Sequence, residues 1–381
     1  MTFEPSRAAA IEKLSIFIEN GLLNYSKSRN FDYGPEKRSN ISCLSPYITH
    51  GVINEQEVID ACLKKYSFIK NEKFIQEVLW RIYWKGWLEL RPKVYSDFIN
   101  DLKKIKNDFK DNKNYLNALE GKTNVECFNY WVNELKSYNY LHNHTRMWFA
   151  SIWIFTLGLP WQLGAEFFMK YLYDGDAASN TLGWRWVAGI QTKGKQYLAS
   201  EWNIKKFTDN RFQNIKLIES ALPIIDERSY EIKKIGLQNN QIKDEKILLL
   251  FENSLSFESS DFRNQTFKKI YLISNNNKNR EIQLSEKVIN FKNNLQHDQI
   301  QSLRKNKIDC EILDIDQIKN IDENFYCIYP NVGENLSYLN SIGIKNFEYL
   351  YRKIDQFSWQ YCNKGFFNFK NCIPKIIQDF I

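Results

Sequence analysis

Residues 173–187 of the chain read YDGDAASNTLGWRWV, and this stretch decides the fold more than any other. Two carboxylates, a glycine and several small residues come first, a composition that lets the backbone approach a bound group closely. An EF-hand is excluded, because its later ligand positions would fall on alanine, leucine and arginine. A calcium site of another kind and an Asx-rich turn both stay open. The indoles that follow, Trp184 and Trp186, are of a kind usually buried in a core, and they are also good one-electron relays.

Two upstream segments each place polar and apolar side chains on one helix face. In HNHTRM, residues 142–147, Asn143, Arg146 and Met147 stand at i, i+3 and i+4. The two histidines of that segment cannot share a face, which argues against a two-histidine metal site. In EVLWR, residues 77–81, the same spacing joins a carboxylate, an indole and a guanidinium that can hydrogen-bond and stack a flat heterocycle. A surface ion pair beside a core tryptophan explains the second pattern equally well.

A third segment, SCLSPY at residues 42–47, brings small hydroxyls to the start of a predicted helix. Side-chain hydroxyls and free backbone amides at a helix start make a ready anion cradle. A plain capped loop is the alternative.

The composition of the 381-residue chain limits the classes of protein to consider. Aromatic residues reach 15%, which excludes general disorder, and the net charge of +7 permits a polyanion as partner. The longest uncharged apolar run, residues 147–161, is too short to span a membrane, and the N-terminus lacks the apolar stretch of a signal peptide. Seven cysteines form no CxxC pair, so we expect reduced thiols in a cytoplasmic protein, with no iron–sulfur or zinc site.

The chain divides into two parts of different pattern. Ten of the eleven tryptophans precede residue 203, and the first 235 residues read as successive helices. Beyond residue 240, short apolar runs at 246–251, 269–274, 309–315 and 325–330 alternate with helical stretches, which predicts a small parallel α/β domain. It contains neither GxGxxG nor a P-loop, so nucleotide binding there is not supported. We therefore predict a mainly α chain with domains 1–238 and 239–381, its tail packed on the sheet.

Five strings in chain order carry a family resemblance: SCLSPYITHG, EVLWR, LHNHTRM, YDGDAASN and GWRW. Together they resemble the FAD-binding helical domain of the photolyase/cryptochrome family, over about residues 5–210. The resemblance implies a U-shaped FAD buried among the helices, and a cavity that receives a pyrimidine dimer flipped out of UV-damaged DNA. Family members usually carry an α/β antenna domain before the flavin domain. Here the only α/β candidate follows it, so an antenna chromophore is in doubt.

The resemblance also implies a role for individual residues. It assigns FAD contacts to Tyr25, Ser42, Leu44, Ser45, Phe74, Arg81, Asn143, Arg146, Asp174, Asp176 and Asn180. It assigns substrate contacts to Glu77, Trp80, Asn143, Met147 and Trp186. Catalytic roles fall to Glu77, to Asn180 facing flavin N5, and to Trp184 and Trp161 as electron relays. The usual third relay would lie near Asp108, so the relay should end at Tyr115, Trp131, Trp148 or Trp153, or be truncated.

Some positions depart from the family pattern. Phe74 replaces a common tryptophan, and Ile41 and Cys43 stand where many relatives have threonine and a basic residue. Relatives that repair six-four photoproducts carry histidines at the positions of Asn143 and Met147, so the residues present favour cyclobutane dimers.

The resemblance leads to a functional prediction with two alternatives. We predict a monomeric, light-driven DNA repair enzyme, a deoxyribodipyrimidine photo-lyase in which reduced FAD donates an electron to a cyclobutane pyrimidine dimer. The alternatives are a cryptochrome-like blue-light photoreceptor without repair activity and a flavin-free nucleic-acid-binding scaffold. Repair is favoured because Glu77, Trp80, Met147, Asn180 and Trp186 keep repair-type identities.

Overall fold

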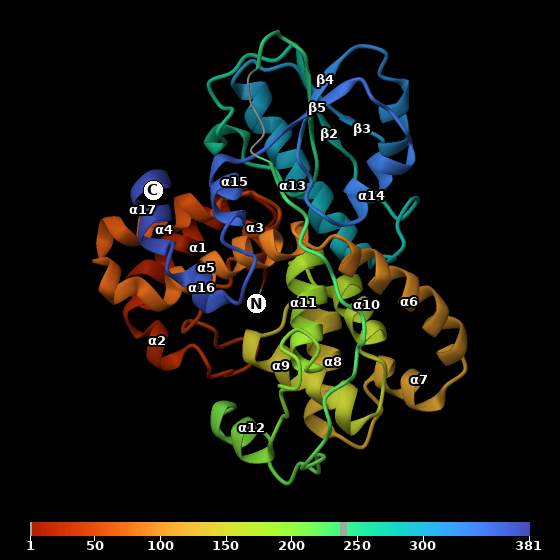
Figure 1. Ribbon diagram of the computed structural model, residues 1–381. Helices are drawn as coiled ribbons and strands as arrows, with labels where there is room; N and C mark the ends of the chain where they lie inside the picture. Colours follow the sequence, from red (N-terminus) through yellow and green to blue (C-terminus); the bar gives the residue numbers. More distant parts are fainter. Residues whose placement is uncertain (1, 237–241) are drawn as a thin grey trace.

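The structure is a computed structural model that describes residues 2–236 and 242–381. The predicted domain boundary at residues 238 and 239 lies outside the described residues. Figure 1 shows a helical part and, beside it, a part built on a parallel sheet. The mainly α fold with a small C-terminal α/β part is therefore confirmed. None of the helices in the described ranges combines the length and apolar character that crossing a membrane requires.

Twelve α-helices of the described residues form the helical part. In chain order they are α1 (Arg7–Asn20), α2 (Tyr25–Ser28), α3 (Ser45–Thr49), α4 (Glu55–Lys65), α5 (Phe68–Glu89), α6 (Lys93–Phe109), α7 (Lys113–Glu120), α8 (Glu126–Tyr138), α9 (Asn143–Ser151), α10 (Trp161–Tyr171), α11 (Ala177–Val187) and α12 (Glu201–Phe207).

Local sequence signals set several of these helix boundaries. The predicted start of α4 is confirmed, because the Asn54 side chain accepts from the Glu57 amide and the Glu57 side chain accepts from the Asn54 amide. Ser6 caps α1 by accepting from the Ala9 amide, and α1 ends before Gly21. A short π-helical turn, Ile152–Thr156, continues α9 into the core.

The sheet part is doubly wound. Its five strands are β1 (Ile247–Leu250), β2 (Lys269–Ile273), β3 (Cys310–Leu313), β4 (Phe325–Ile328) and β5 (Phe347–Leu350), all parallel in the order β3-β2-β1-β4-β5. The sequence predicted the first four and missed β5. Helix α13 (Glu286–Lys305) lies between the sheet and the helical part, and α14 (Glu334–Ser341) contributes Leu339 to the core on the opposite sheet face (Figure 1).

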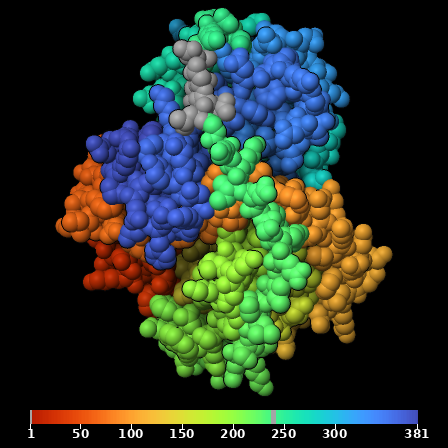
Figure 2. All heavy atoms as spheres, in the orientation of Figure 1, coloured from red at the N-terminus to blue at the C-terminus, as the bar shows by residue number. Residues whose placement is uncertain are grey.

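The tail of the chain does not pack on the sheet, so that prediction was wrong. Helices α15 (Lys353–Trp359), α16 (Phe366–Lys370) and α17 (Ile373–Phe380) return to the helical part, where α15 and α16 lie along α5 (Figure 1). Figure 2 shows this blue segment against the red and orange helices. Gly86 permits the approach, since a Cβ there would stand 2.4 Å from the Trp359 ring. One hydrophobic core consequently joins α1, α3, α4 and α5 to the sheet and the tail.

Candidate functional site

A buried carboxylate, Asp174, joins three helices at the centre of the helical part. Its Oδ2 accepts from Arg146 of α9 at 2.8 Å and from the Ser45 hydroxyl at the start of α3. Burial alone would raise the pKa of Asp174, but the Arg146 charge and hydrogen bonds from Arg146 and Ser45 hold that pKa below its usual value. The second oxygen, Oδ1, is buried with no partner among the described residues. An ionised carboxylate with one free oxygen is therefore held ready for a further donor.

Helix α5 presents its predicted site residues beside this carboxylate. Arg81 donates to the Thr49 hydroxyl, and its charge helps to lower the pKa of Asp174, whereas its Nε is buried without a partner in the described chain. Glu77, one turn earlier, pairs with Arg29 at 3.0 Å and with Lys73 at 3.1 Å. The i, i+4 spacing thus brings both charged groups to one face of α5, as predicted.

The residues before α3 line the same region from the other side. Leu44 is buried, and its amide donates to the Ser42 hydroxyl at 3.4 Å. Cys43 takes a left-handed backbone conformation, φ 52°, that bends the chain into α3. Tyr25 packs edge-on against Phe74, ring centroids 5.1 Å apart, and burial raises its pKa above the usual value.

Asp176 of the acidic turn caps the start of helix α11. The Asp176 carboxylate accepts from the Ser179 amide at 2.7 Å, so the Asx-turn alternative describes this carboxylate. Among the residues that the structure describes, no group of three or more His, Cys, Asp or Glu side chains could hold a metal ion. One turn on, the buried Asn180 amide donates to the Ala165 carbonyl at 2.9 Å.

The predicted substrate residues lie nearer the surface. Asn143 is exposed, Met147 is half-buried, and Trp186 stacks on Tyr197 with ring centroids 5.8 Å apart. Trp80 has a neighbour that the sequence did not predict. The Phe366 ring of α16 stacks on the Trp80 ring, with the ring centroids 3.6 Å apart and the ring planes inclined by 9°. Because 286 residues separate the two rings in sequence, no local pattern could have shown this contact.

The predicted relay tryptophans, Trp184 and Trp161, are both buried among other aromatic rings. Trp184 packs over Gly164, where a Cβ would come within 2.2 Å of the indole. The centroid of the Trp184 ring lies 6.3 Å from that of Trp153, and the Trp153 centroid lies 6.0 Å from that of the half-buried Tyr115. Trp161 stacks on Phe98 instead, at 5.3 Å. Ring contacts therefore run from Trp184 through Trp153 to Tyr115. Trp153 and Tyr115 are two of the four residues that the sequence analysis named as possible ends of the electron relay.

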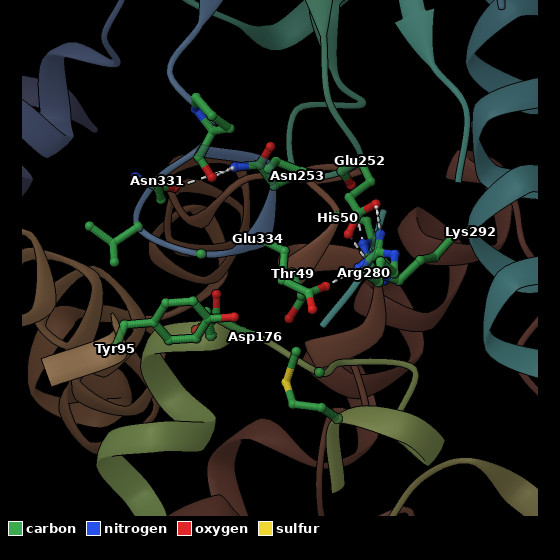
Figure 3. A pocket seen from close by; sticks show the side chains of 17 residues that line it. Thr49, His50, Tyr95, Asp176, Glu252, Asn253, Arg280, Lys292, Asn331 and Glu334 are labelled. Carbon is green, nitrogen blue, oxygen red and sulfur yellow. Dashed lines mark hydrogen bonds and ion pairs between the residues drawn. The ribbon is translucent and has the colours of Figure 1, made fainter. Parts of the chain in front are cut away.

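A cavity of about 70 Å³ lies between the helical part and the sheet part (Figure 3). Its walls come from Thr49 and Asp176 on one side, and from the segments after β1 and β4 on the other. Strand order reverses between β1 and β4, the place where doubly wound sheets form a crevice. Charged side chains that line the cavity form ion pairs with one another: Arg280 pairs with Glu252 at 2.7 Å and with Glu334 at 2.8 Å. This cavity extends the site from Asp176 toward the sheet, and no sequence pattern predicted it.

Comparisons with known proteins found similar sequences for the helical part. Residues 74–229 match the family model described as the FAD binding domain of DNA photolyase. A deoxyribodipyrimidine photo-lyase of Buchnera aphidicola is 31% identical over 193 residues, covering 49% of this chain and 39% of the relative. The Escherichia coli photo-lyase is 27% identical over 202 residues, covering 51% of this chain and 42% of the relative. The matched part thus spans about two fifths of these relatives.

Two solved structures were also found similar to part of this chain. A bacterial class III photolyase from Agrobacterium tumefaciens has a TM-score of 0.46 at 25% identity, covering 54% of this chain and 43% of that one. A Synechocystis cryptochrome has a TM-score of 0.48 at 21% identity, covering 55% and 44%. By sequence, residues 74–229 in the helical part of this chain are therefore similar to the FAD binding domain of DNA photolyase.

Proposed function

We propose that this protein repairs cyclobutane pyrimidine dimers in DNA, using FAD and blue light. The observation that carries the proposal is the cluster of Ser45, Arg146 and Asp174, with Arg81 beside it. The family match supplies the cofactor, and the names of the relatives supply the reaction. The photoreceptor alternative has no observation of its own in its favour.

The residues present fit a flavin. A flavin ring edge carries both hydrogen-bond donors and acceptors, and the cluster offers one of each. Asp174 Oδ1 can accept and Arg81 Nε can donate, and both atoms are buried without a partner among the described residues. The residues that would hold FAD are therefore Ser45, Arg81, Arg146 and Asp174, with Asn180 on the neighbouring helix.

In the proposed mechanism the protein keeps charged side chains in fixed positions around the cofactor and the substrate. Bound FAD, once reduced and excited, supplies the electron that opens the cyclobutane ring and takes it back afterwards. Asp174 stays ionised, because its pKa lies below the usual range, and it fixes Arg146 by a 2.8 Å ion pair. A charge pair that is already ordered costs no reorganisation when an electron moves. Glu77, held by Arg29, offers carboxylate oxygens to the edge of a flipped base.

Aromatic side chains would hold the dimer. Trp80 of α5 and Trp186 of α11 are both half-buried, so each retains some ring surface for a base. Stacking on an aromatic ring is worth roughly 1–3 kcal/mol per base. Two such contacts would offset much of the cost of extruding a dimer, which is a few kcal/mol.

A matched pair of variants tests the cofactor part of the proposal. Asp174→Asn leaves the half-buried Arg146 without its charge partner, so we expect at least about tenfold weaker FAD binding, equal to about 1.4 kcal/mol. Asp60→Asn, in an exposed pair with Lys64 on α4, removes a carboxylate of the same kind and should bind FAD like the wild type. The measurement is FAD fluorescence quenching on titration of the purified protein.

Light-driven repair is measured directly on the wild type. The reduced, FAD-loaded protein is given an oligonucleotide with one thymine dimer, and restored thymines are counted in blue light and in darkness. Repair in light alone supports the proposal. Stoichiometric FAD without any repair would favour the photoreceptor alternative instead.

A further inference from the structure

A basic surface with an exposed indole lies next to the proposed site. Within residues 186–216, six basic residues stand against two acidic ones, an excess of four in a chain whose total excess is seven. Four lysines of this segment, Lys193, Lys195, Lys205 and Lys206, are exposed, and none has an ion-pair partner in the part of the chain that the structure describes. We call Trp202 and these four lysines the α12 patch.

Trp202 is the unusual member of the α12 patch. Its side chain is 63% exposed, although large aromatic rings are normally buried. Lys206, one turn later on α12, holds its ammonium 5.6 Å from the indole centroid. An exposed ring flanked by cations offers a stacking face and charge compensation together, which is the chemistry of single-strand binding.

The α12 patch is joined to the proposed site by direct contacts. Trp148 of α9 donates to the Asn203 side chain at 2.9 Å, and the His144 ring lies 5.1 Å from Phe207. These contacts fix α12 to the helix that presents Asn143 and Met147. The loop that carries Lys193 and Lys195 also carries Tyr197, on which Trp186 stacks. In Figure 1, α12 accordingly lies next to α9 at the edge of the helical part.

We propose that the α12 patch binds single-stranded DNA that continues from the flipped dimer. The lysines neutralise phosphates, and one unpaired base stacks on Trp202. Duplex DNA fits less well, because its bases are stacked on one another and leave no free face for the indole. The inference takes DNA as the partner from the proposed function, whereas the position of the strand comes from the α12 patch alone.

The test uses undamaged DNA in darkness, so that it depends on neither FAD nor repair. A fluorescent 20-nucleotide single strand, its duplex and the RNA of the same sequence are titrated with the full chain, and anisotropy gives each affinity. We expect the single strand to bind most tightly. Trp202→Ala should weaken that binding about fivefold or more, and Trp202→Phe should retain most of it. Ile69→Ala removes another exposed apolar side chain, 85% exposed on α5, and should change nothing.

The lysines are tested by salt dependence. The double variant Lys193→Ala/Lys195→Ala should reduce the slope of log affinity against log salt by about 1.4, since each phosphate contact to a single strand contributes about 0.7. Lys110→Ala/Lys113→Ala, an exposed pair beside α7, should leave the slope unchanged.

Several results would overturn the inference. They are wild-type affinity in Trp202→Ala, an unchanged salt slope in the lysine pair, tighter binding of duplex or RNA, or a wild-type dimer that Trp202→Ala converts to monomer. Any of these leaves light-driven repair untouched, and an absence of repair leaves the strand-binding measurement valid.

Discussion

Single residues of this protein show how a spacing in sequence becomes a chemical group in space. The position of Glu77 and Arg81 on one face of α5 follows from their i, i+4 spacing, and the Arg146–Asp174 ion pair follows from the family resemblance. Two neighbours could not be predicted: Thr49, which accepts from Arg81, and Phe366, which covers one face of Trp80. Both depend on contacts between distant segments, for which a single sequence holds no signal.

The Phe366–Trp80 stack leads to the first prediction at this scale. We expect Trp80→Ala to weaken damaged-DNA binding about tenfold, because stacking contributes roughly 1–3 kcal/mol per base. Phe366→Leu should stay within about threefold of the wild type, since Phe366 supports one face of Trp80 and leaves the other to the base. Affinities for a dimer-containing oligonucleotide measured in darkness decide this. A clear gain of affinity in Phe366→Leu would mean that Phe366 occupies the base-stacking face itself.

The second prediction at this scale concerns Trp184. Trp184→Phe keeps an aromatic ring against Gly164, so FAD should stay bound. Photoreduction of the bound FAD should slow about tenfold or more, since a barrier only about 1.4 kcal/mol higher gives that factor. Trp153→Phe should slow it as well, because Trp153 joins Trp184 to Tyr115. Absorbance under blue light with an external thiol reductant follows the reaction. A wild-type rate in Trp184→Phe would show that Trp184 serves packing alone.

Among the elements, α5 connects the two parts of the molecule. Its last turn carries Glu89, a buried carboxylate that accepts from the Tyr329 hydroxyl at 2.8 Å and from the Val332 amide at 2.7 Å. Both donors come directly after strand β4. Glu89 therefore connects the helical part to the carboxyl end of this strand. Burial raises the pKa of Glu89 to about 7, although these hydrogen bonds oppose the rise.

The raised pKa of Glu89 predicts a pH-dependent stability. The folded protein binds the proton more tightly than the unfolded chain, so this contribution is complete below pH 4.5 and is lost as pH rises through 7. The contribution of Glu89 to the free energy of unfolding should therefore fall by about 1–3 kcal/mol between pH 5.5 and 8.5. Glu134, whose pKa burial also raises to about 7, adds to the fall.

Two variants measure the share that belongs to Glu89. Glu89→Gln cannot titrate, and its amide can accept from Val332 while donating to the Tyr329 oxygen, so its urea unfolding should depend less on pH than that of the wild type. Glu120→Gln, an exposed control in a pair with Lys122, should keep the wild-type slope. Equal slopes in all three proteins would refute the assignment.

At the scale of the whole molecule, the parts share a core rather than standing apart. The sequence predicted both parts and four of the five strands, because helix periodicity and β-prone runs are local signals. It placed the tail wrongly, since an amphipathic tail helix can cover a sheet or a helix, and only the three-dimensional arrangement selects between them. The tail crosses back to α5 because Gly86 leaves room for Trp359 and Cys362.

This close approach predicts the effect of one methyl group. Gly86→Ala would place a Cβ 2.4 Å from the Trp359 ring and 2.6 Å from the Cys362 sulfur, so we expect a loss of about 1–3 kcal/mol through overpacking. Gly183→Ala, also within a helix, meets no atom within 4 Å and should be neutral or slightly stabilising. Urea unfolding of the two variants provides the comparison. Equal stabilities of the two variants would contradict the prediction, because they would show that Trp359 and Cys362 can move away from α5 at little cost.

The central proposal is that this chain, with FAD bound, uses light to split cyclobutane pyrimidine dimers. The most direct measurement is a single-turnover repair assay, in which the reduced, FAD-loaded protein in excess receives either a cyclobutane dimer or a six-four photoproduct in the same oligonucleotide. We predict that one exposure to blue light restores the cyclobutane substrate and leaves the six-four substrate and all dark samples unchanged. An intact cyclobutane dimer after illumination of protein that has bound both FAD and DNA would contradict the account.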